Sequence, residues 1–163
     1  MIAPVTSGEE LRAVMRHVPA PVAVVTVTVD VDGQRAGLTV ASLVSLSLEP
    51  ALVGVAIRRD AALHELLRES PEHAISVLAA GQEHLAQHFA RGVPPIALWD
   101  NVPLRDADRP PQLDGAVAWL RCRLQQEHPT GDHTFFVAIV EDAETGPGVT
   151  NPLVYHGQAY ASL

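Results

Sequence analysis

The chain has 163 residues, 47% hydrophobic and 18% charged, which is typical of a folded globular protein and too apolar for a disordered one. The net charge of −8 argues against a nucleic-acid partner, because phosphate backbones are bound by clustered lysine and arginine. No apolar run approaches the roughly 20 residues of a membrane helix, and the N-terminal segment is acidic where a signal peptide is basic. We therefore expect one soluble, cytoplasmic domain over residues 1–163, with no membrane partner.

The N-terminal third is predicted to form a short helix and a β-hairpin. Ser7-Gly8-Glu9-Glu10 has the form of a capping box, in which the serine and the second glutamate satisfy free backbone N–H groups. Apolar residues at helical spacing follow, and two prolines end the helix: Leu11, Val14, Met15 and Val18, then Pro19 and Pro21. Residues 22–29 are nearly all valine and threonine, as in a strand, and a turn at residues 30–33 leads into extended residues 34–48.

The rest of the chain combines short strands with two helices. We expect helices over residues 60–69, with Asp60 as N-cap, and over residues 82–90. Residues 92–114 are rich in proline and aspartate without a clear period, which predicts a long surface loop. The remaining strands are expected at residues 51–57, 74–78, 116–126, 134–140 and 152–160. Because so few helices cannot connect a parallel sheet, the predicted fold is mainly β, an antiparallel β-barrel with a few covering helices.

Common catalytic and metal-binding signatures are absent from the sequence. It contains no nucleophile elbow, no P-loop and no dinucleotide-binding glycine motif. Cys122 is the only cysteine and lies in an alternating apolar run, so we expect a core residue and not a reactive thiol. His84 and His88 stand four residues apart and could face one ion, but no third ligand is evident. We therefore expect no metal.

Residues 36–50 form an extended segment with unusually many small and hydroxyl-bearing side chains. Composition leaves two interpretations open. One is a strand packed closely against another backbone, with serine and threonine on a wet face. The other is a ligand site, because small side chains let the backbone approach a flat molecule. An isoalloxazine ring would suit such a site, since its two carbonyl oxygens need N–H donors and its N3–H needs an acceptor.

Six stretches carry patterns that occur together, in this order, in one known family. The first includes Gly37-Leu38-Thr39-Val40-Ala41-Ser42, and another is Gly131-Asp132-His133 with the strand that follows. The others span residues 64–70, 74–90, 113–122 and 152–155. Each stretch alone is a weak signal, but six in register are strong. They resemble the signature of the flavin reductase family, which has the FMN-binding split-barrel fold.

The resemblance implies an NAD(P)H-dependent flavin reductase. Such an enzyme transfers hydride from NADH or NADPH to FMN or FAD and supplies reduced flavin to a partner flavin-dependent monooxygenase. A homodimer is also implied, in which the second subunit helps to close the flavin site. Two other functions stay open: a flavin-binding electron carrier or sensor without reductase activity, and a flavin-less interaction subunit of the same fold.

The resemblance also assigns site residues. One strand is expected to contact the isoalloxazine edge, largely through backbone groups, and two serines beyond it face either the ribityl chain or the barrel: Thr39, Val40, Ala41 and Ser42, then Ser45 and Ser47. A turn holds the phosphate and the end of a helix approaches the flavin tail: Arg58, Arg59 and Asp60, then Phe89, Ala90 and Arg91.

Two further residues are expected on the open face of the ring. His133 would be the catalytic residue near the nicotinamide, although a turn histidine bonded to Asp132 is an alternative interpretation. Tyr155 would close the same pocket. The family commonly has hydroxyl residues where Ala61 and Ala62 stand here, which suits an enzyme that treats flavin as a diffusing substrate.

Overall fold

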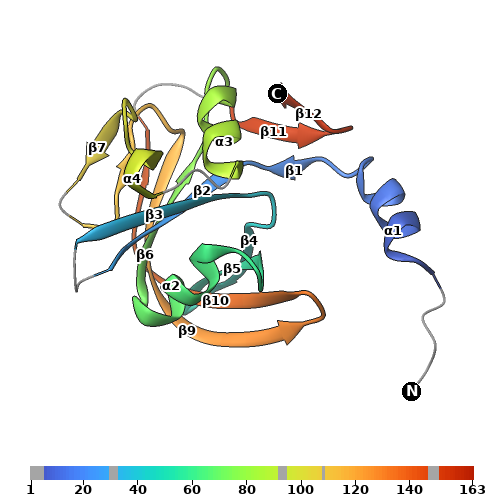
Figure 1. Ribbon diagram of the computed structural model, residues 1–163, viewed down its shortest axis with the longest axis horizontal. Coiled ribbons are helices and arrows are strands. Elements are labelled where there is room, and N and C mark those ends of the chain that lie inside the picture. The colour runs from blue at the N-terminus through green and yellow to red at the C-terminus, as the bar shows by residue number, and fades with distance from the viewer. Residues whose placement is uncertain (1–5, 30–32, 92–94, 108, 147–150) are drawn as a thin grey trace.

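A seven-stranded antiparallel sheet forms the body of the molecule (Figure 1). The computed structural model describes residues 6–29, 33–91, 95–107, 109–146 and 151–163. Neighbouring strands follow the order β3-β2-β6-β9-β10-β5-β4. Their bounds are Ala23–Val29 (β2), Gln34–Val40 (β3), Val44–Leu48 (β4), Ala51–Arg58 (β5), Glu72–Val77 (β6), Ala118–Thr130 (β9) and His133–Thr145 (β10).

The sheet curls until its two edges approach each other. β3 and β4 are consecutive in the chain but stand at opposite ends of the strand order, joined by residues 41–43. β3 contacts β5 without a hydrogen-bonded ladder in the described residues, and α2 (Ala62–Glu69) packs against β2, β3 and β5 (Figure 1). The barrel therefore has an open seam, and the predicted antiparallel split barrel is confirmed.

Both faces of β2 are buried, which explains why its sequence does not alternate between apolar and polar residues. Its side chains contribute to two clusters: Ala23, Val25 and Val27 inside the barrel, and Val24 with the preceding Val22 outside it. The outer cluster lies beneath α3 (Glu83–Ala90). There, a Cβ atom on Gly37 would stand 2.8 Å from the ring of Phe89, so the glycine is what lets α3 pack onto β3.

The predictions for residues 92–114 and 152–160 were wrong in detail. Residues 92–114 are not a structureless loop, because they contain α4 (Pro95–Leu98), β7 (Leu104–Asp106) and β8 (Gln112–Leu113), with Leu98 and Leu113 buried in the outer cluster. Isolated apolar residues among prolines have no period that would reveal such burial. Residues 34–48 are largely extended, as predicted, and form the two strands β3 and β4. Residues 152–160 also belong to two strands, β11 (Leu153–His156) and β12 (Ala159–Ser162), which form a separate three-stranded sheet with β1 (Ala20–Pro21).

Asp60 is not the N-cap of α2. Ala61 holds that position without a side-chain hydrogen bond, while the Asp60 carboxylate pairs with Arg58. A well-placed arginine competes successfully for the carboxylate, and the sequence pattern did not reveal that competition. The predicted turn at residues 30–33 falls mostly on residues 30–32, which lie outside the described residues. The hairpin on either side of it is confirmed, since β2 and β3 pair from Val29 and Gln34 onward.

Helix α1 (Gly8–Met15) projects away from the barrel (Figure 1). The predicted capping box is confirmed, because the Glu10 N–H donates to the Ser7 hydroxyl and the Ser7 N–H donates to the Glu10 carboxylate. The helix buries none of its residues. Its apolar positions remain largely open to solvent, with exposed fractions of 55% for Leu11, 64% for Val14 and 52% for Met15.

Cys122 lies in the barrel core, as predicted. Burial, with a smaller contribution from the Glu141 carboxylate, raises the pKa of its thiol to about 12. The thiol is therefore protonated at neutral pH. Within the part of the chain that the structure describes, no helix is both long and apolar enough to cross a membrane.

Candidate functional site

The chain crosses the barrel seam at residues 41–43, between the last residue of β3 and the first of β4. Ser42 fixes this crossing to β5. Its hydroxyl accepts the N–H of Ala56 at 2.9 Å and donates to the carbonyl of Ala56 at 3.0 Å. One side chain thus takes the place of a neighbouring strand at the edge of β5. Because the hydroxyl is engaged in both directions, any ligand contact at Ser42 would fall mainly to the backbone.

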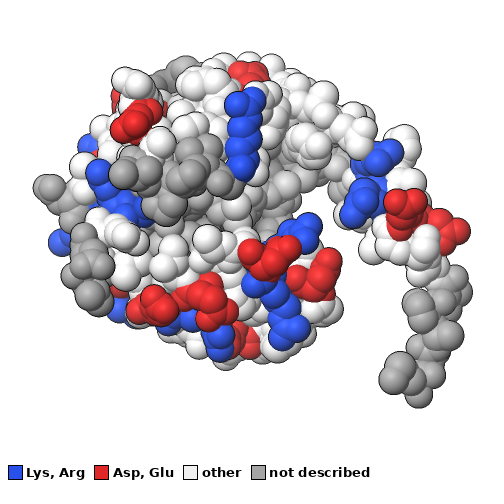
Figure 2. Space-filling model, in the orientation of Figure 1, with Lys and Arg blue, Asp and Glu red and all other residues white. Residues whose placement is uncertain are grey.

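A cleft of about 760 Å³ opens beside the crossing. Its walls come from the crossing itself, from β1 and β11, and from α1, whose basic side chains face the barrel across it (Figure 2). Ala41, Ser42 and Tyr155 all line this cleft, so the structure brings these three predicted residues together. Tyr155 stands edge-on to Tyr160, with 5.4 Å between the ring centroids.

Another predicted group gathers where β5 ends and β10 begins. Arg58 and His133 are paired across these two strands, and the Arg59 N–H donates to the carbonyl of Asp132 at 3.1 Å. Arg58 makes two hydrogen bonds to the Asp60 carboxylate, at 2.9 and 2.7 Å, which lower the pKa of that carboxyl. The charge of Arg58 is therefore largely matched.

Arg59 and His133 are the more available members of that group. The Arg59 guanidinium makes one long hydrogen bond, 3.5 Å, to a turn carbonyl, and no carboxylate among the described residues pairs with it. The His133 ring approaches the Asp132 carboxylate at 2.7 Å, and this bond lowers the pKa of Asp132. The side chain of His133 is 38% exposed, so its ring retains an open surface.

The seam crossing and this group are close in space. Ser42 bonds to Ala56, and Arg58 follows two residues later on β5, which corresponds to about 7 Å along a strand. A ligand lying along this edge could reach both. Its flat portion would meet small residues and backbone groups, and its anionic portion would meet Arg59. That is the combination which a flavin with its phosphate requires.

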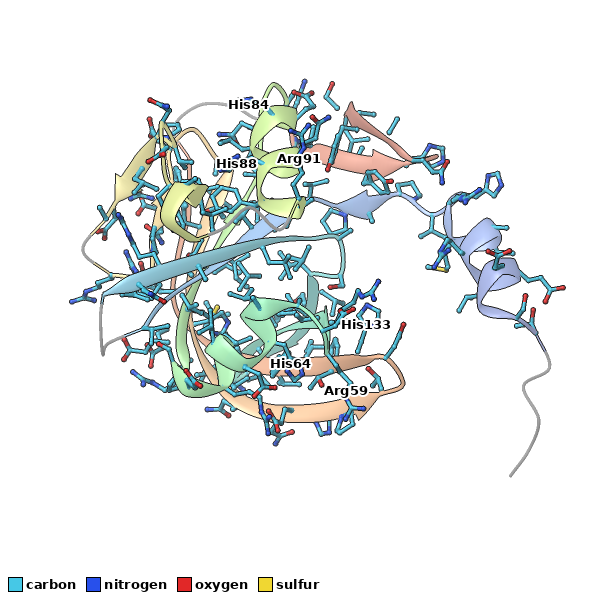
Figure 3. All side chains as sticks on the ribbon, viewed as in Figure 1. Arg59, His64, His84, His88, Arg91 and His133 are labelled. Carbon is cyan, nitrogen blue, oxygen red and sulfur yellow. The ribbon has the colours of Figure 1, made fainter. Side chains whose placement is uncertain are left out.

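The remaining predicted residues lie farther from this edge. Ala90 and Arg91 are exposed at the end of α3, and Figure 3 shows Arg91 on the other side of the barrel opening from Arg59 and His133. Phe89 is buried in the outer cluster, so its predicted contact with the flavin tail would have to come from its backbone. Thr39 donates its hydroxyl to the carbonyl of Ala86 at 2.7 Å, which binds β3 to α3.

Three strand residues have mainly structural surroundings. Val40 is buried in the barrel core. Ser45 is exposed on β4, opposite Val53, and the hydroxyl of Ser47 accepts the Glu49 N–H at 3.3 Å. Their contacts with flavin stay predictions.

Of the two histidines of α3, His88 contacts the outer cluster and His84 is exposed. His88 bonds through Nε2 to the carbonyl of Leu98 at 2.7 Å, and with His84 and Arg91 it lines a hollow of about 300 Å³. Across the described residues, no group of three or more histidine, cysteine, aspartate or glutamate side chains could hold a metal ion. Absence of a metal stays a prediction.

Sequence reasoning missed two arginines of the large cleft. Arg12 and Arg16 stand one helical turn apart on α1 and both line it. Their spacing of four residues was visible in the sequence. What the sequence could not show is that the apolar face of this helix would stand beside the barrel seam without packing into the barrel.

Comparisons with known proteins agree with this geometry. A family model described as the flavin reductase like domain matches residues 15–163. The chain is 39% identical over 142 residues to an NADH-dependent FAD reductase of Streptomyces globisporus, covering 85% of this chain and 76% of that protein. It is 37% identical over 131 residues to the reductase component of 4-hydroxyphenylacetate 3-monooxygenase of Thermus thermophilus, covering 80% of each.

A solved structure supports the same assignment. The NADH:FAD oxidoreductase of Streptomyces globisporus C-1027 has a TM-score of 0.88 against this chain at 33% identity, covering 100% of this chain and 97% of that one. A second structure of that oxidoreductase, in complex with NAD and FAD fragments, has a TM-score of 0.85.

The fold and the seam define an oxidoreductase with a flavin-binding split barrel. The chain belongs to the flavin reductase family. It is an enzyme that takes hydride from NADH or NADPH and passes it to FMN or FAD. The fold, the activity and the cofactors predicted from the sequence are thereby confirmed.

Proposed function

We propose that the flavin lies along the barrel seam, with its ring edge on residues 41–43 and its phosphate at Arg59, and that the nicotinamide enters beside His133. The observation that carries this proposal is the double hydrogen bond between Ser42 and Ala56. It fixes the seam crossing next to the exposed ends of β5 and β10. The site is then formed by rigid strand ends, which favours orientation of two flat rings.

When bound, the flavin supplies the chemistry, because it accepts the hydride that the nicotinamide donates. The contribution of the chain is to bind and to orient. Backbone groups at the seam would hold the ring edge. Because Arg58 is paired with Asp60, the phosphate would fall to Arg59. Hydride transfer needs no general base, so His133 is not assigned a proton-transfer role. Its exposed ring surface would position the nicotinamide.

This assignment is tested by substituting His133 with alanine and following nicotinamide oxidation with added FMN, FAD or riboflavin. We expect the KM for the nicotinamide to rise about tenfold, the equivalent of about 1.4 kcal/mol, while the KM for flavin changes little. His128→Ala, an exposed histidine of the same hairpin, is the matched control. Equal changes in both KM values, or none, would remove His133 from the site.

We further propose that the chain works as a homodimer in which the apolar face of α1 packs on the second copy. Four apolar side chains on or just after this helix are about half exposed or more, and the cleft beside them adjoins the seam. An exposed apolar stripe of this kind is typical of an interface. A second copy seated there would cover the stripe and close the cleft over the flavin site.

Sedimentation velocity tests the dimer. Val14→Glu should weaken association at least about tenfold, because it places a charge in an apolar interface, while the thermal unfolding of the barrel stays unchanged. Ala13→Glu puts the same charge on the other face of α1 and should leave the dimer intact. A wild-type protein that sediments as a monomer at all concentrations would refute the proposal.

The acceptor of the reduced flavin is proposed to be a flavin-dependent monooxygenase. This rests on the relatives, one of which is the reductase component of a monooxygenase. Reduced flavin that diffuses between separate proteins also agrees with the absence of hydroxyl side chains at Ala61 and Ala62. The cytoplasmic location, the single domain over residues 1–163 and the absence of nucleic-acid and membrane partners stay predictions.

A further inference from the structure

His64 has no part in the site proposed above, yet its surroundings are unusually specific. The residue is buried, and both nitrogens of its ring have partners. Nδ1 lies 2.8 Å from the carboxylate of Glu65, and Nε2 lies 2.8 Å from the hydroxyl of Thr134. The ring also stands edge-on to Phe136, with 5.3 Å between centroids.

The protonation pattern follows from the partners. An ionised carboxylate can only accept, so Nδ1 carries the hydrogen and donates it to Glu65. In a neutral ring Nε2 then accepts, and Thr134 donates its O–H. The same order of hydroxyl, imidazole and carboxylate activates nucleophiles in other enzymes. Here Thr134 is buried, so no substrate reaches its hydroxyl and the arrangement must act on the structure around it.

A chain of polar contacts extends this arrangement to the surface. Glu65 also accepts from Arg68 at 3.2 Å, and Arg68 donates to Glu127 of β9 at 2.9 and 3.0 Å. Hydrogen bonding to His64 is the main cause of the lowered pKa of Glu65. Helix α2 is therefore bonded to both strands of the β9–β10 hairpin. The His64–Thr134 bond is buried, whereas the Arg68–Glu127 bonds are exposed.

The two ends of the His64–Thr134 bond adjoin the two halves of the proposed site. On one side, the backbone N–H of His64 donates to the backbone carbonyl of Ala61 at 3.0 Å, at the end of the turn that carries Arg59. On the other side, Thr134 directly follows His133 on β10. Figure 3 shows His64, Arg59 and His133 grouped in the same lower part of the barrel.

We propose that His64 is a positioning residue which, through Thr134, holds the turn carrying Arg59 and the strand carrying His133 in fixed relation. The inference rests on the proposed flavin site. At the surface the two segments share the bond from the Arg59 N–H to the Asp132 carbonyl, where water competes. The buried bond is stronger for the same geometry, because it lies in a medium of lower dielectric constant.

The test removes the hydroxyl without changing the volume. Thr134→Val should raise the Kd for FMN, measured by quenching of flavin fluorescence, and the KM for the nicotinamide by about fivefold each, as expected for loss of one hydrogen bond. kcat should change less. Thr134→Ser keeps the hydroxyl and should restore both constants to within about twofold.

A purely structural role predicts a different result. His73→Leu removes another buried imidazole, on β6 and two strands away from β10. It should change the melting temperature and leave both constants unaltered. If Thr134→Val behaves in the same way, with altered melting and unaltered constants, the inference is wrong. If Thr134→Val does not fold, Glu65→Ala perturbs the exposed end of the same chain, and unaltered constants there would overturn it equally.

Failure of this inference is distinguishable from failure of the proposed site. Arg59→Ala and His133→Ala act on the site directly. If both leave the Kd for flavin and the KM for the nicotinamide unchanged, the proposed site is wrong and the inference falls with it. If they raise these constants while Thr134→Val does not, the site stands and His64 has no positioning role.

Discussion

Helices α1 and α2 have the same length, eight residues, and both place apolar side chains at helical spacing. Their surroundings are opposite. α2 buries Leu63, His64 and Leu67 against the barrel interior, whereas α1 buries no residue. Helical periodicity thus predicts that the apolar face of a helix packs against something, but it does not show which surface that is. The face of α2 is covered by its own chain, and we assign the cover of α1 to a second copy.

The largest expected effect is the difference in stability between truncating a leucine of α2 and truncating a leucine of α1. Leu67 is fully buried, so Leu67→Ala should lower the free energy of unfolding by about 2–5 kcal/mol. Leu11→Ala should change it by less than about 0.5 kcal/mol at protein concentrations where the chain is monomeric. Urea denaturation measures both. Losses of similar size would mean that α1 packs on its own barrel in solution.

Acid should weaken the barrel through His73, whose ring is buried and bonded to the carbonyl of Pro71 at 3.2 Å. Burial lowers the pKa of His73 from 6.5 to about 4. Between these values the unfolded chain binds a proton that the folded chain does not, so stability falls as the pH drops through this window and is unaffected above it. A difference of that size is worth about 3 kcal/mol.

Thermal or urea unfolding at pH 7 and pH 4 checks this prediction, with His73→Leu as the comparison. The wild-type protein should lose more stability on acidification than the variant, by up to about 3 kcal/mol. Equal losses would show that the acid sensitivity comes from other groups.

The smallest expected effect is confined to α1. Ser7→Ala removes the capping side chain and should destabilise this helix by about 1 kcal/mol, because the N–H of Glu10 loses its acceptor. Hydrogen exchange should then be faster in α1 and unchanged in the barrel strands. Faster exchange throughout the barrel would contradict the separation between the two regions.

Much of the fold could be predicted from local patterns. The capping box at Ser7, the valine-rich strand and the apolar face of α2 all depend on neighbouring residues, and each was confirmed. The predictions that failed depend on three-dimensional arrangement and not on the local sequence pattern. The burial of Leu98 and Leu113 depends on the outer face of β2, and the competition of Arg58 for Asp60 depends on the turn geometry.

The site was predicted less completely, for the same reason. Family resemblance predicts a role for the seam residues and for His133, but it did not show that the Ser42 hydroxyl would be engaged by Ala56. It also gave no hint that His64 and Thr134, 70 residues apart, would meet inside the barrel. Such pairings are set by the curl of the sheet, and a single sequence does not specify them.

Burial protects Cys122 from oxidation. Reduced flavin that meets oxygen before its acceptor yields peroxide, which attacks thiolates. The one thiol of this enzyme is buried and protonated, with a pKa of about 12, so the barrel offers peroxide no reactive sulfur. Met15 on α1 is 52% exposed, and its sulfoxide would be polar. When the two copies are apart, oxidation would therefore strike the proposed subunit contact and leave the barrel itself intact.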